Sequence, residues 1–142
     1  MKETSQTNIT KAMILAAGLG TRLKPLTDAK PKALLEINGR TLLETAITHI
    51  AEAGVKEIII NVHHMADQIV GYLKANNHFG LQISVSDESG QLLDTGGGLK
   101  ETEDFFQGNQ PFIVRNVDVI SDLDFRKMLD YHDRNSAIAT LA

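Results

Sequence analysis

The stretch over residues 12–27 constrains this chain most, because an apolar run ends there in a glycine-rich, basic segment. Its first six residues, Ala-Met-Ile-Leu-Ala-Ala, predict a buried first strand. Gly18 and Gly20 follow, and a glycine loop that leaves a strand lets backbone N–H groups approach an anion closely, since no Cβ stands in the way. Arg22 adds a planar fork of donors that matches phosphate oxygens. The pattern predicts a nucleotide triphosphate site.

Other phosphate-binding motifs are excluded by spacing. The P-loop needs four residues between its glycines and then Gly-Lys-Ser/Thr, which is absent, and the dinucleotide fingerprint needs Gly or Ala where Leu23 stands. Pro25 and Pro31 argue against a helix directly after the loop. The two glycines alone are equally compatible with a plain structural turn. The interpretation as a phosphate site rests on the string Arg22, Pro25, Thr27, Pro31, Lys32 and Leu34, with Lys24, Lys30 and Lys32 as point charges near the same anion.

This string resembles the signature of the sugar-1-phosphate nucleotidyltransferases, most of all the bacterial enzymes that act on N-acetylmuramate, mannose or heptose 1-phosphate. The matching residues are Leu15-Ala16-Ala17-Gly18-x-Gly20-x-Arg22-Leu23-x-Pro25-x-Thr27 and Pro31-Lys32-x-Leu34. The resemblance implies a Rossmann-like domain whose glycine loop holds the nucleotide. It also implies that Arg22 grips the phosphates and that Lys32 neutralises charge near the α-phosphorus. The nucleotide-binding residues expected in this segment are Leu15, Ala16, Ala17, Gly18, Gly20, Thr21 and Arg22.

Composition sets the broad class. The chain has 142 residues, 42% of them hydrophobic and 23% charged, which is typical of one globular domain. A net charge of −4 argues against a nucleic-acid partner, and the absence of cysteine excludes disulfides and thiolate zinc sites. Residues 1–10 are polar and are expected to form a flexible N-terminal tail. Because no signal peptide or long apolar run is found, we expect no membrane partner and a cytoplasmic location.

Alternating strand-like and helix-like segments predict an α/β fold, a three-layer α/β/α arrangement with a mainly parallel sheet. Residues 11–142 are interpreted as the nucleotide-binding part of such a domain. Because the chain stops inside a predicted strand and family members are longer, we expect a truncated, N-terminal part. Strands are predicted over residues 12–17, 34–37, 57–62, 81–85, 112–114 and 136–141. Helices are predicted from a capping box at Thr41 and Glu44 to Gly54, and over residues 65–76, 99–106 and 124–134.

A candidate metal ligand, Asp118, follows the apolar run over residues 112–114. Open α/β sheets place their ligands at the carboxyl ends of central strands, and magnesium needs only one or two carboxylates besides substrate phosphates. The family resemblance likewise implies that Asp118 binds the catalytic Mg²⁺ and that Asn116 contacts substrate. Val117 departs from the glycine of the family's triplet, so local geometry is expected to differ. The alternative is an aspartate that only caps the next turn. The family's second metal-binding aspartate lies beyond this chain.

The segment Leu93-Asp94-Thr95-Gly96-Gly97-Gly98 resembles the family segment that contacts the base and the sugar. Three glycines before a helix open a surface that a flat base approaches closely, which makes Thr95, Gly96 and Gly97 candidate nucleotide-binding residues, with Gly97 also near the substrate. A mobile loop leading into the helix is the alternative. Glu88 is a weaker candidate for reading the base edge. His63 and His64 point to opposite sides of the backbone and are not expected to form a metal pair.

The sequence therefore predicts a Mg²⁺-dependent transferase that joins an NTP and a sugar 1-phosphate into an NDP-sugar and pyrophosphate. The family resemblance favours UTP or GTP as the nucleotide, and a cell-wall or polysaccharide precursor as the product. Arg22, Lys32 and Asp118 are the expected catalytic residues, with Lys32 also binding substrate. Two alternatives stay open: a non-catalytic nucleotide-binding or regulatory domain, and a phosphocholine cytidylyltransferase.

Overall fold

A parallel four-stranded sheet forms the centre of the molecule. The computed structural model describes residues 9–142. The strand order is β5-β4-β1-β6, and every neighbouring pair is parallel. A separate two-stranded hairpin turns at Asn38 and Gly39, both with positive φ. The strands are β1 (Lys11–Leu15), β2 (Glu36–Ile37), β3 (Arg40–Thr41), β4 (Glu57–Val62), β5 (Gln82–Asp87) and β6 (Ile113–Asn116).

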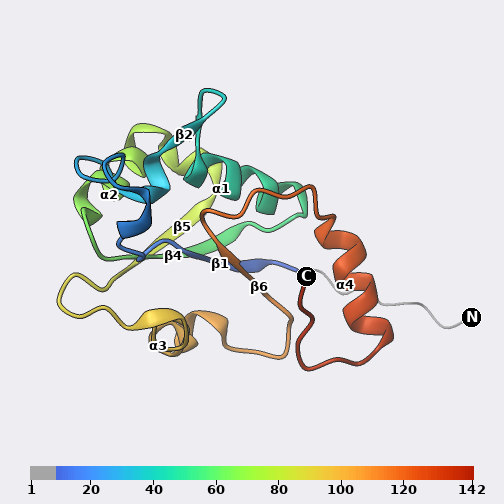
Figure 1. Ribbon diagram of the computed structural model, residues 1–142. Coiled ribbons are helices and arrows are strands. Elements are labelled where there is room, and N and C mark those ends of the chain that lie inside the picture. The colour runs from blue at the N-terminus through green and yellow to red at the C-terminus, as the bar shows by residue number, and fades with distance from the viewer. Residues whose placement is uncertain (1–8) are drawn as a thin grey trace, which may run out of the picture.

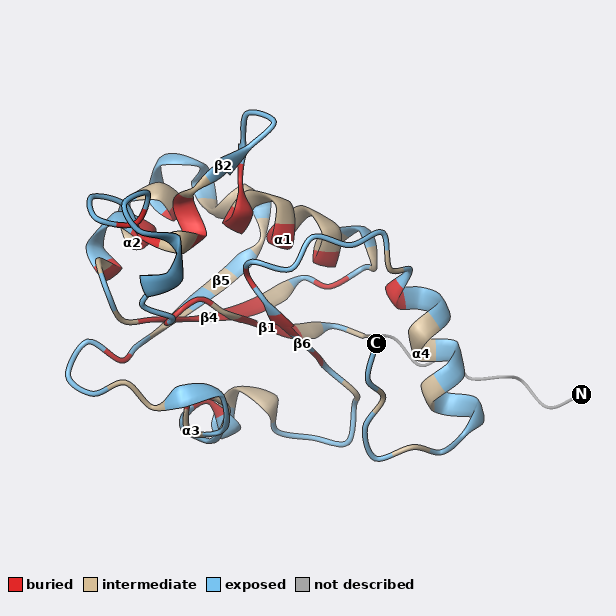
Figure 2. Cartoon of the chain, viewed as in Figure 1, coloured by how far each residue is buried: buried red, intermediate tan, exposed pale blue. Residues whose placement is uncertain are grey.

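Helices cover both faces of this sheet, so the predicted three-layer α/β/α arrangement is confirmed. Figure 1 shows α1 and α2 on one face, α3 on the other, and α4 beyond the sheet beside the end of α1. The core lies mainly between the sheet and α1, where the inward side chains of β1, β4 and α1 are buried (Figure 2). The α-helices are α1 (Leu42–Glu52), α2 (Ala66–Ala75), α3 (Asp94–Glu101) and α4 (Phe125–Arg134), and none of the described helices is long and apolar enough to cross a membrane.

Local sequence signals account for the ends of two helices. The Thr41 hydroxyl caps α1 by accepting a hydrogen bond from the backbone N–H of Glu44, and Gly54 follows the helix with a φ of 100°. Asp124 caps α4 by accepting from the N–H groups of Arg126 and Lys127. These caps satisfy donors that a helix start otherwise leaves unpaired. Both helices begin where the sequence predicts.

Three sequence predictions need correction. The helix predicted over residues 99–106 begins at Asp94, so Gly96 and its neighbours lie inside α3, not in a loop before it. The apolar run over residues 112–114, which composition suggests is buried, lies partly in β6 at the edge of the sheet, where buried and exposed residues alternate, and Val114 is 41% exposed. Residues 136–141 form no strand, since no strand lies beside them to complete a ladder, and Ile138 is fully exposed.

The predicted flexible tail falls mostly on residues 1–8, which lie outside the described residues. The two described residues of that segment are attached to the fold. Ile9 packs against the core, and the Thr10 carbonyl accepts hydrogen bonds from the N–H groups of Lys56 and Glu57. These contacts attach the start of the described chain to the fold just before β1.

Candidate active site

The ends of three strands meet at one edge of the sheet. Leu15, the last residue of β1, lies opposite Asn61 on β4 and Asn116 on β6. After β1 the chain continues outward through β4 and β5, then returns to form β6 on the other side of β1. Open α/β sheets bind their ligands at such a reversal, outside the carboxyl ends of the strands. The glycine loop after β1 and the Asp118 segment after β6 both leave the sheet there.

The glycine loop is fixed at its base and open at its tip. The buried N–H of Ala16 donates to the Asn61 side-chain oxygen at 2.8 Å. At the other end of the loop, the Thr27 hydroxyl donates to the Gly20 carbonyl, also at 2.8 Å. Gly18 and Leu19 are exposed, and no acceptor within the described chain bonds their N–H groups. The loop thus presents free backbone donors on a rigid base, as an anion cradle requires.

Gly20 is the position in this loop where only glycine fits. Its φ of 65° lies in the left-handed region, and a Cβ there would come within 2.9 Å of the Thr27 methyl group. Gly20 precedes the short 3-10 helix Thr21–Leu23, which carries Arg22. The glycine therefore turns the chain so that Arg22 follows the loop directly.

Lys32 lies between the glycine loop and the carboxylate at the end of β6. Its Nζ is 2.9 Å from Asp118 Oδ2. A Cβ added to Gly18 would lie 3.4 Å from the same Nζ, so the loop tip passes directly over the ammonium group. Residues far apart in the sequence are thereby brought into one site, as the sequence analysis predicts.

Arg22 completes the cluster of charges. Desolvation by partial burial acts to raise the pKa of Asp118, but the hydrogen bond and charge of Lys32, with a contribution from the Arg22 charge, hold that pKa below its usual value. Both cations thus act on the same carboxylate. The other two lysines are engaged elsewhere: Lys24 lies 3.8 Å from Asp28, and Lys30 lies 3.6 Å from Glu36.

Comparison with known proteins shows the family of this chain. The family model described as "Nucleotidyl transferase" matches residues 11–142. The chain belongs to this nucleotidyltransferase family. It is 43% identical over 111 residues to the N-acetylmuramate alpha-1-phosphate uridylyltransferase of Caulobacter vibrioides, covering 77% of this chain and 46% of that protein. It is 36% identical over 133 residues to the mannose-1-phosphate guanyltransferase of Yarrowia lipolytica, covering 92% of this chain and 36% of that protein.

A solved structure shows the same fold. The crystal structure of HddC from Yersinia pseudotuberculosis complexed with GMP-PN superposes with a TM-score of 0.77 at 30% identity, over 87% of this chain and 54% of that one. The chain thus spans between about a third and about half of the length of these relatives. The predicted family and the predicted α/β nucleotidyltransferase fold are confirmed.

The valine that departs from the family's triplet fits without strain. Val117 is 1% exposed, and its φ lies outside the left-handed region. Its N–H donates to the Leu15 carbonyl at 3.1 Å, which continues the pairing of β1 and β6 by one residue. The side chain therefore packs into the core of this nucleotidyltransferase domain, while Asp118 beside it points to Lys32. The position does not require glycine.

The predicted base-binding residues lie at the start of α3. Thr95 and Gly96 are exposed, and Gly97 is half-buried. The N–H of Leu93, just before the helix, donates to Glu88 Oε2 at 3.2 Å, and Asn61 donates to Glu88 Oε1 at 2.9 Å. Because Asn61 also holds Ala16, one chain of hydrogen bonds connects the glycine loop with the start of α3.

Three members of this network carry roles that the sequence analysis missed. Asn61 and Glu88 are buried at 3% and 4% exposure. A Cβ on Gly98 would lie 2.7 Å from Glu88 Oε1 and 2.8 Å from the Asn61 amide nitrogen, so Gly98 gives α3 its close approach to the network. Glu88 therefore has internal partners on both oxygens, in place of the base-reading role considered for it. Asn61, a polar residue in an otherwise apolar run, was the available signal.

The donor set at Asp118 fits a magnesium ion. Its carboxylate is a hard oxygen donor with a side chain 42% exposed, next to the loop expected to hold phosphates. Magnesium keeps several waters and takes the rest of its ligands from one or two carboxylates and substrate phosphates. Among residues 9–142, no three His, Cys, Asp or Glu side chains gather into a metal cluster. His63 instead bonds the Glu88 carbonyl through Nδ1 at 2.6 Å.

Proposed function

We propose that this domain catalyses nucleotidyl transfer from an NTP to a sugar 1-phosphate. A phosphate oxygen of the sugar 1-phosphate attacks the α-phosphorus, the bond from that phosphorus to the β-phosphate oxygen breaks, and pyrophosphate leaves. Phosphoryl chemistry of this kind asks a protein mainly for alignment and charge stabilisation. The observation that carries the proposal is Lys32, whose ammonium group lies between an open glycine loop and Asp118.

Each side chain has a distinct task in this reaction. The free N–H groups of the glycine loop bind the phosphates of the nucleotide, and Arg22 holds the leaving pyrophosphate. Lys32 reduces the repulsion between the two phosphates that must meet. Asn116 ends β6 and Asp118 follows two residues later, and we assign the sugar 1-phosphate to this side of the site. Asp118 would hold Mg²⁺, which would supply further neutralisation of phosphate charge when bound.

UTP is the proposed nucleotide and N-acetylmuramate 1-phosphate the proposed sugar substrate. The support is similarity, because the Caulobacter relative is named for this reaction and shares 43% identity. GTP with mannose 1-phosphate is the second candidate, supported by the Yarrowia relative. A cytoplasmic place in the supply of cell-wall precursors follows from the first pair of substrates.

Titration calorimetry and a pyrophosphate-release assay test this function. The protein is first titrated with UTP, GTP, CTP and ATP in magnesium. Each NTP is then incubated with N-acetylmuramate, mannose or glucose 1-phosphate, or with phosphocholine. We expect UTP to bind and to release pyrophosphate with N-acetylmuramate 1-phosphate. Binding without release in any combination supports a non-catalytic nucleotide-binding domain instead, release with phosphocholine supports a cytidylyltransferase, and no binding at all overturns the proposal.

A further inference from the structure

Arg115 is a buried cation next to the proposed metal site. It lies on β6, is 7% exposed, and has its pKa lowered by desolvation. No carboxylate within the described part of the chain forms an ion pair with it, and its Nε has no hydrogen-bond partner there. Burying a charge with so little compensation costs free energy that an apolar side chain in the same strand position avoids. The contacts that it does make therefore need an explanation.

Those contacts hold the backbone on the C-terminal side of Asp118, and another bond holds it on the N-terminal side. One terminal nitrogen of Arg115 donates to the Val119 carbonyl, one residue beyond Asp118. On the near side of Asp118, the N–H of Val117 donates to the Leu15 carbonyl at 3.1 Å. The backbone is thus held immediately before and immediately after the carboxylate. The other terminal nitrogen of Arg115 donates to His49 Nδ1 on α1.

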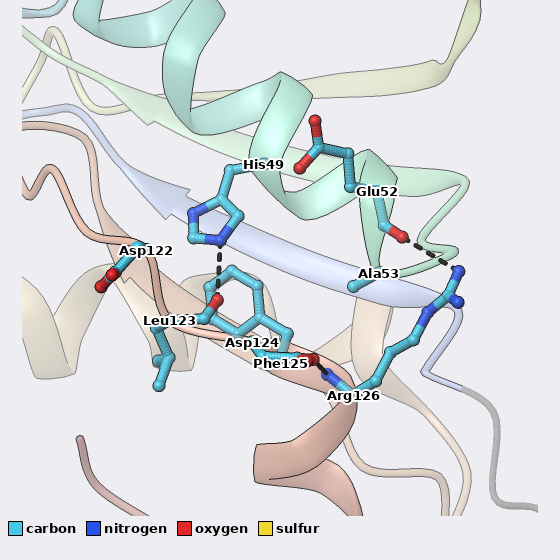
Figure 3. Close-up of a pocket in the computed structure, with 8 residues that line it drawn as sticks. All are labelled: His49, Glu52, Ala53, Asp122, Leu123, Asp124, Phe125 and Arg126. Atoms are coloured by element: carbon cyan, nitrogen blue, oxygen red, sulfur yellow. Dashed lines mark hydrogen bonds between the residues drawn. The ribbon is translucent and has the colours of Figure 1, made fainter.

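His49 extends the support along the same segment. Because Nδ1 faces a permanent donor, the ring proton resides on Nε2, which donates to the Leu123 carbonyl at 2.7 Å (Figure 3). The ring also packs against Phe125, with centroids 4.7 Å apart. Two carbonyls that follow Asp118, those of Val119 and Leu123, are therefore held by one Arg–His pair anchored on β6 and α1.

We propose that Arg115 and His49 are positioning residues that hold the Asp118 carboxylate in place for its metal. The inference rests on the proposed function, because it concerns the ion that Asp118 is expected to hold. Neither residue needs to touch nucleotide or metal. Groups that orient a metal ligand matter greatly, since losing one typically weakens metal binding or activity by about 10–100-fold.

The test measures how much magnesium strengthens UTP binding, by titrating the protein with UTP in Mg²⁺ and again in EDTA. Arg115→Met removes both donated hydrogen bonds with little change in side-chain length. We expect it to reduce the magnesium enhancement by about tenfold or more, while UTP affinity in EDTA is unchanged. Arg115→Lys is expected to be intermediate, because an ammonium group reaches one of the two acceptors but not both.

Arg126→Met is the matched control. Arg126 also donates to a backbone carbonyl, that of Glu52 on α1 at 3.0 Å, and it comes from the same part of the chain (Figure 3). This bond holds no residue next to Asp118, so the magnesium enhancement of UTP binding should stay at the wild-type value. Thermal melts of every variant report whether the fold is kept, and Arg115→Lys decides the question if Arg115→Met does not fold.

His49 variants separate the two arms of the pair. In His49→Gln the side-chain amide lies near the position of Nε2, so it keeps a donor for the Leu123 carbonyl but loses the acceptor for Arg115. In His49→Asn the amide lies near the position of Nδ1, so it keeps the acceptor for Arg115 but loses the donor for Leu123. We expect the glutamine variant to lose more of the magnesium enhancement. Wild-type enhancement in Arg115→Met or Arg115→Lys, or equal losses in Arg115→Met and Arg126→Met, overturns the positioning role. If another NTP binds in place of UTP, the same comparison is made with that nucleotide. A wild-type protein that binds no NTP overturns the proposed function, whereas NTP binding that magnesium does not strengthen overturns the positioning role alone.

Discussion

The two sides of the proposed nucleotide site use polar groups in opposite ways. On the phosphate side, formed by the glycine loop, Lys32 and Asp118, the side chains of the ion pair remain 18% and 42% exposed. On the base side, formed by Asn61, Glu88 and α3, both polar side chains are almost completely buried and bonded within the protein. The phosphate side leaves charged groups available to a ligand, whereas the buried hydrogen bonds of the base side hold α3 in place. Substitutions should therefore affect chemistry first on the phosphate side and folding first on the base side.

Lys32→Ala tests the phosphate side and should have the largest effect. Removing one preorganised cation from the phosphates costs roughly 3–4 kcal/mol of barrier, or two to three orders of magnitude in turnover. Pyrophosphate release under saturating UTP and sugar 1-phosphate measures this loss. The melting temperature should change little, because an exposed ion pair contributes at most about 1 kcal/mol to stability.

Lys74→Ala provides the control for this experiment. Lys74 is an exposed lysine on α2, away from the site, so its removal changes the net charge equally without removing a contact to phosphate. Turnover in that variant should match the wild type. Comparable losses in the two variants would mean that Lys32 acts only through overall charge.

Asn61→Leu tests the base side. The substitution leaves the Ala16 N–H and one Glu88 oxygen without their partner in a buried place, which should lower the free energy of unfolding by about 1–3 kcal/mol. Urea melts followed by circular dichroism measure the change. Asn135→Ala is the control, because this exposed amide bonds only the Tyr131 carbonyl one turn earlier and should shift stability within about 0.5 kcal/mol. Equal stability of the two variants would exclude a structural role for the Asn61 network.

Alanine substitutions at two glycines of α3 should change the stability of the fold in opposite directions, which tests the base side further. Gly98→Ala forces a methyl group against Glu88 and Asn61 and should destabilise the fold by about 1–3 kcal/mol. Gly96→Ala meets nothing within 4 Å and should stabilise it by roughly 0.5–1 kcal/mol through helix propensity. Thermal melts compare them directly. Two shifts of the same sign would show that α3 does not pack on this network as described.

The contrast between the two sides also explains what sequence reasoning found and what it missed. The meeting of Lys32 with Asp118 was predictable, because the glycine loop and the residues after an apolar strand leave a parallel sheet at the same edge. The roles of Arg22, Lys32 and Asp118 in the reaction stay predictions. Asn61 and Glu88 were not predictable, since their importance depends on a buried side-chain hydrogen bond between them. That bond forms only because the pairing of β4 with β5 brings the residue after β5 beside the end of β4. The glycines of α3 were misplaced for a related reason, because glycine usually interrupts helices but here permits close packing. The role of Arg115 could not be predicted from the sequence either, because its hydrogen-bond partners come together only in the fold.

The smallest effect expected is the contribution of Asp118 to stability, which depends on pH. Because the Lys32 hydrogen bond and charge outweigh desolvation and lower the pKa of Asp118 in the folded state, the unfolded chain takes up this proton at higher pH than the native one. The stabilisation is therefore present above the unfolded pKa, near 3.8, and is lost as pH falls through the native value. Urea melts of the wild type and Asp118→Asn should differ by about 0.2–1 kcal/mol at pH 7 and converge in acid. A stability difference between the two proteins that does not change with pH would mean that the Asp118 charge contributes nothing to folding. The role of that charge would then lie in ligand binding alone.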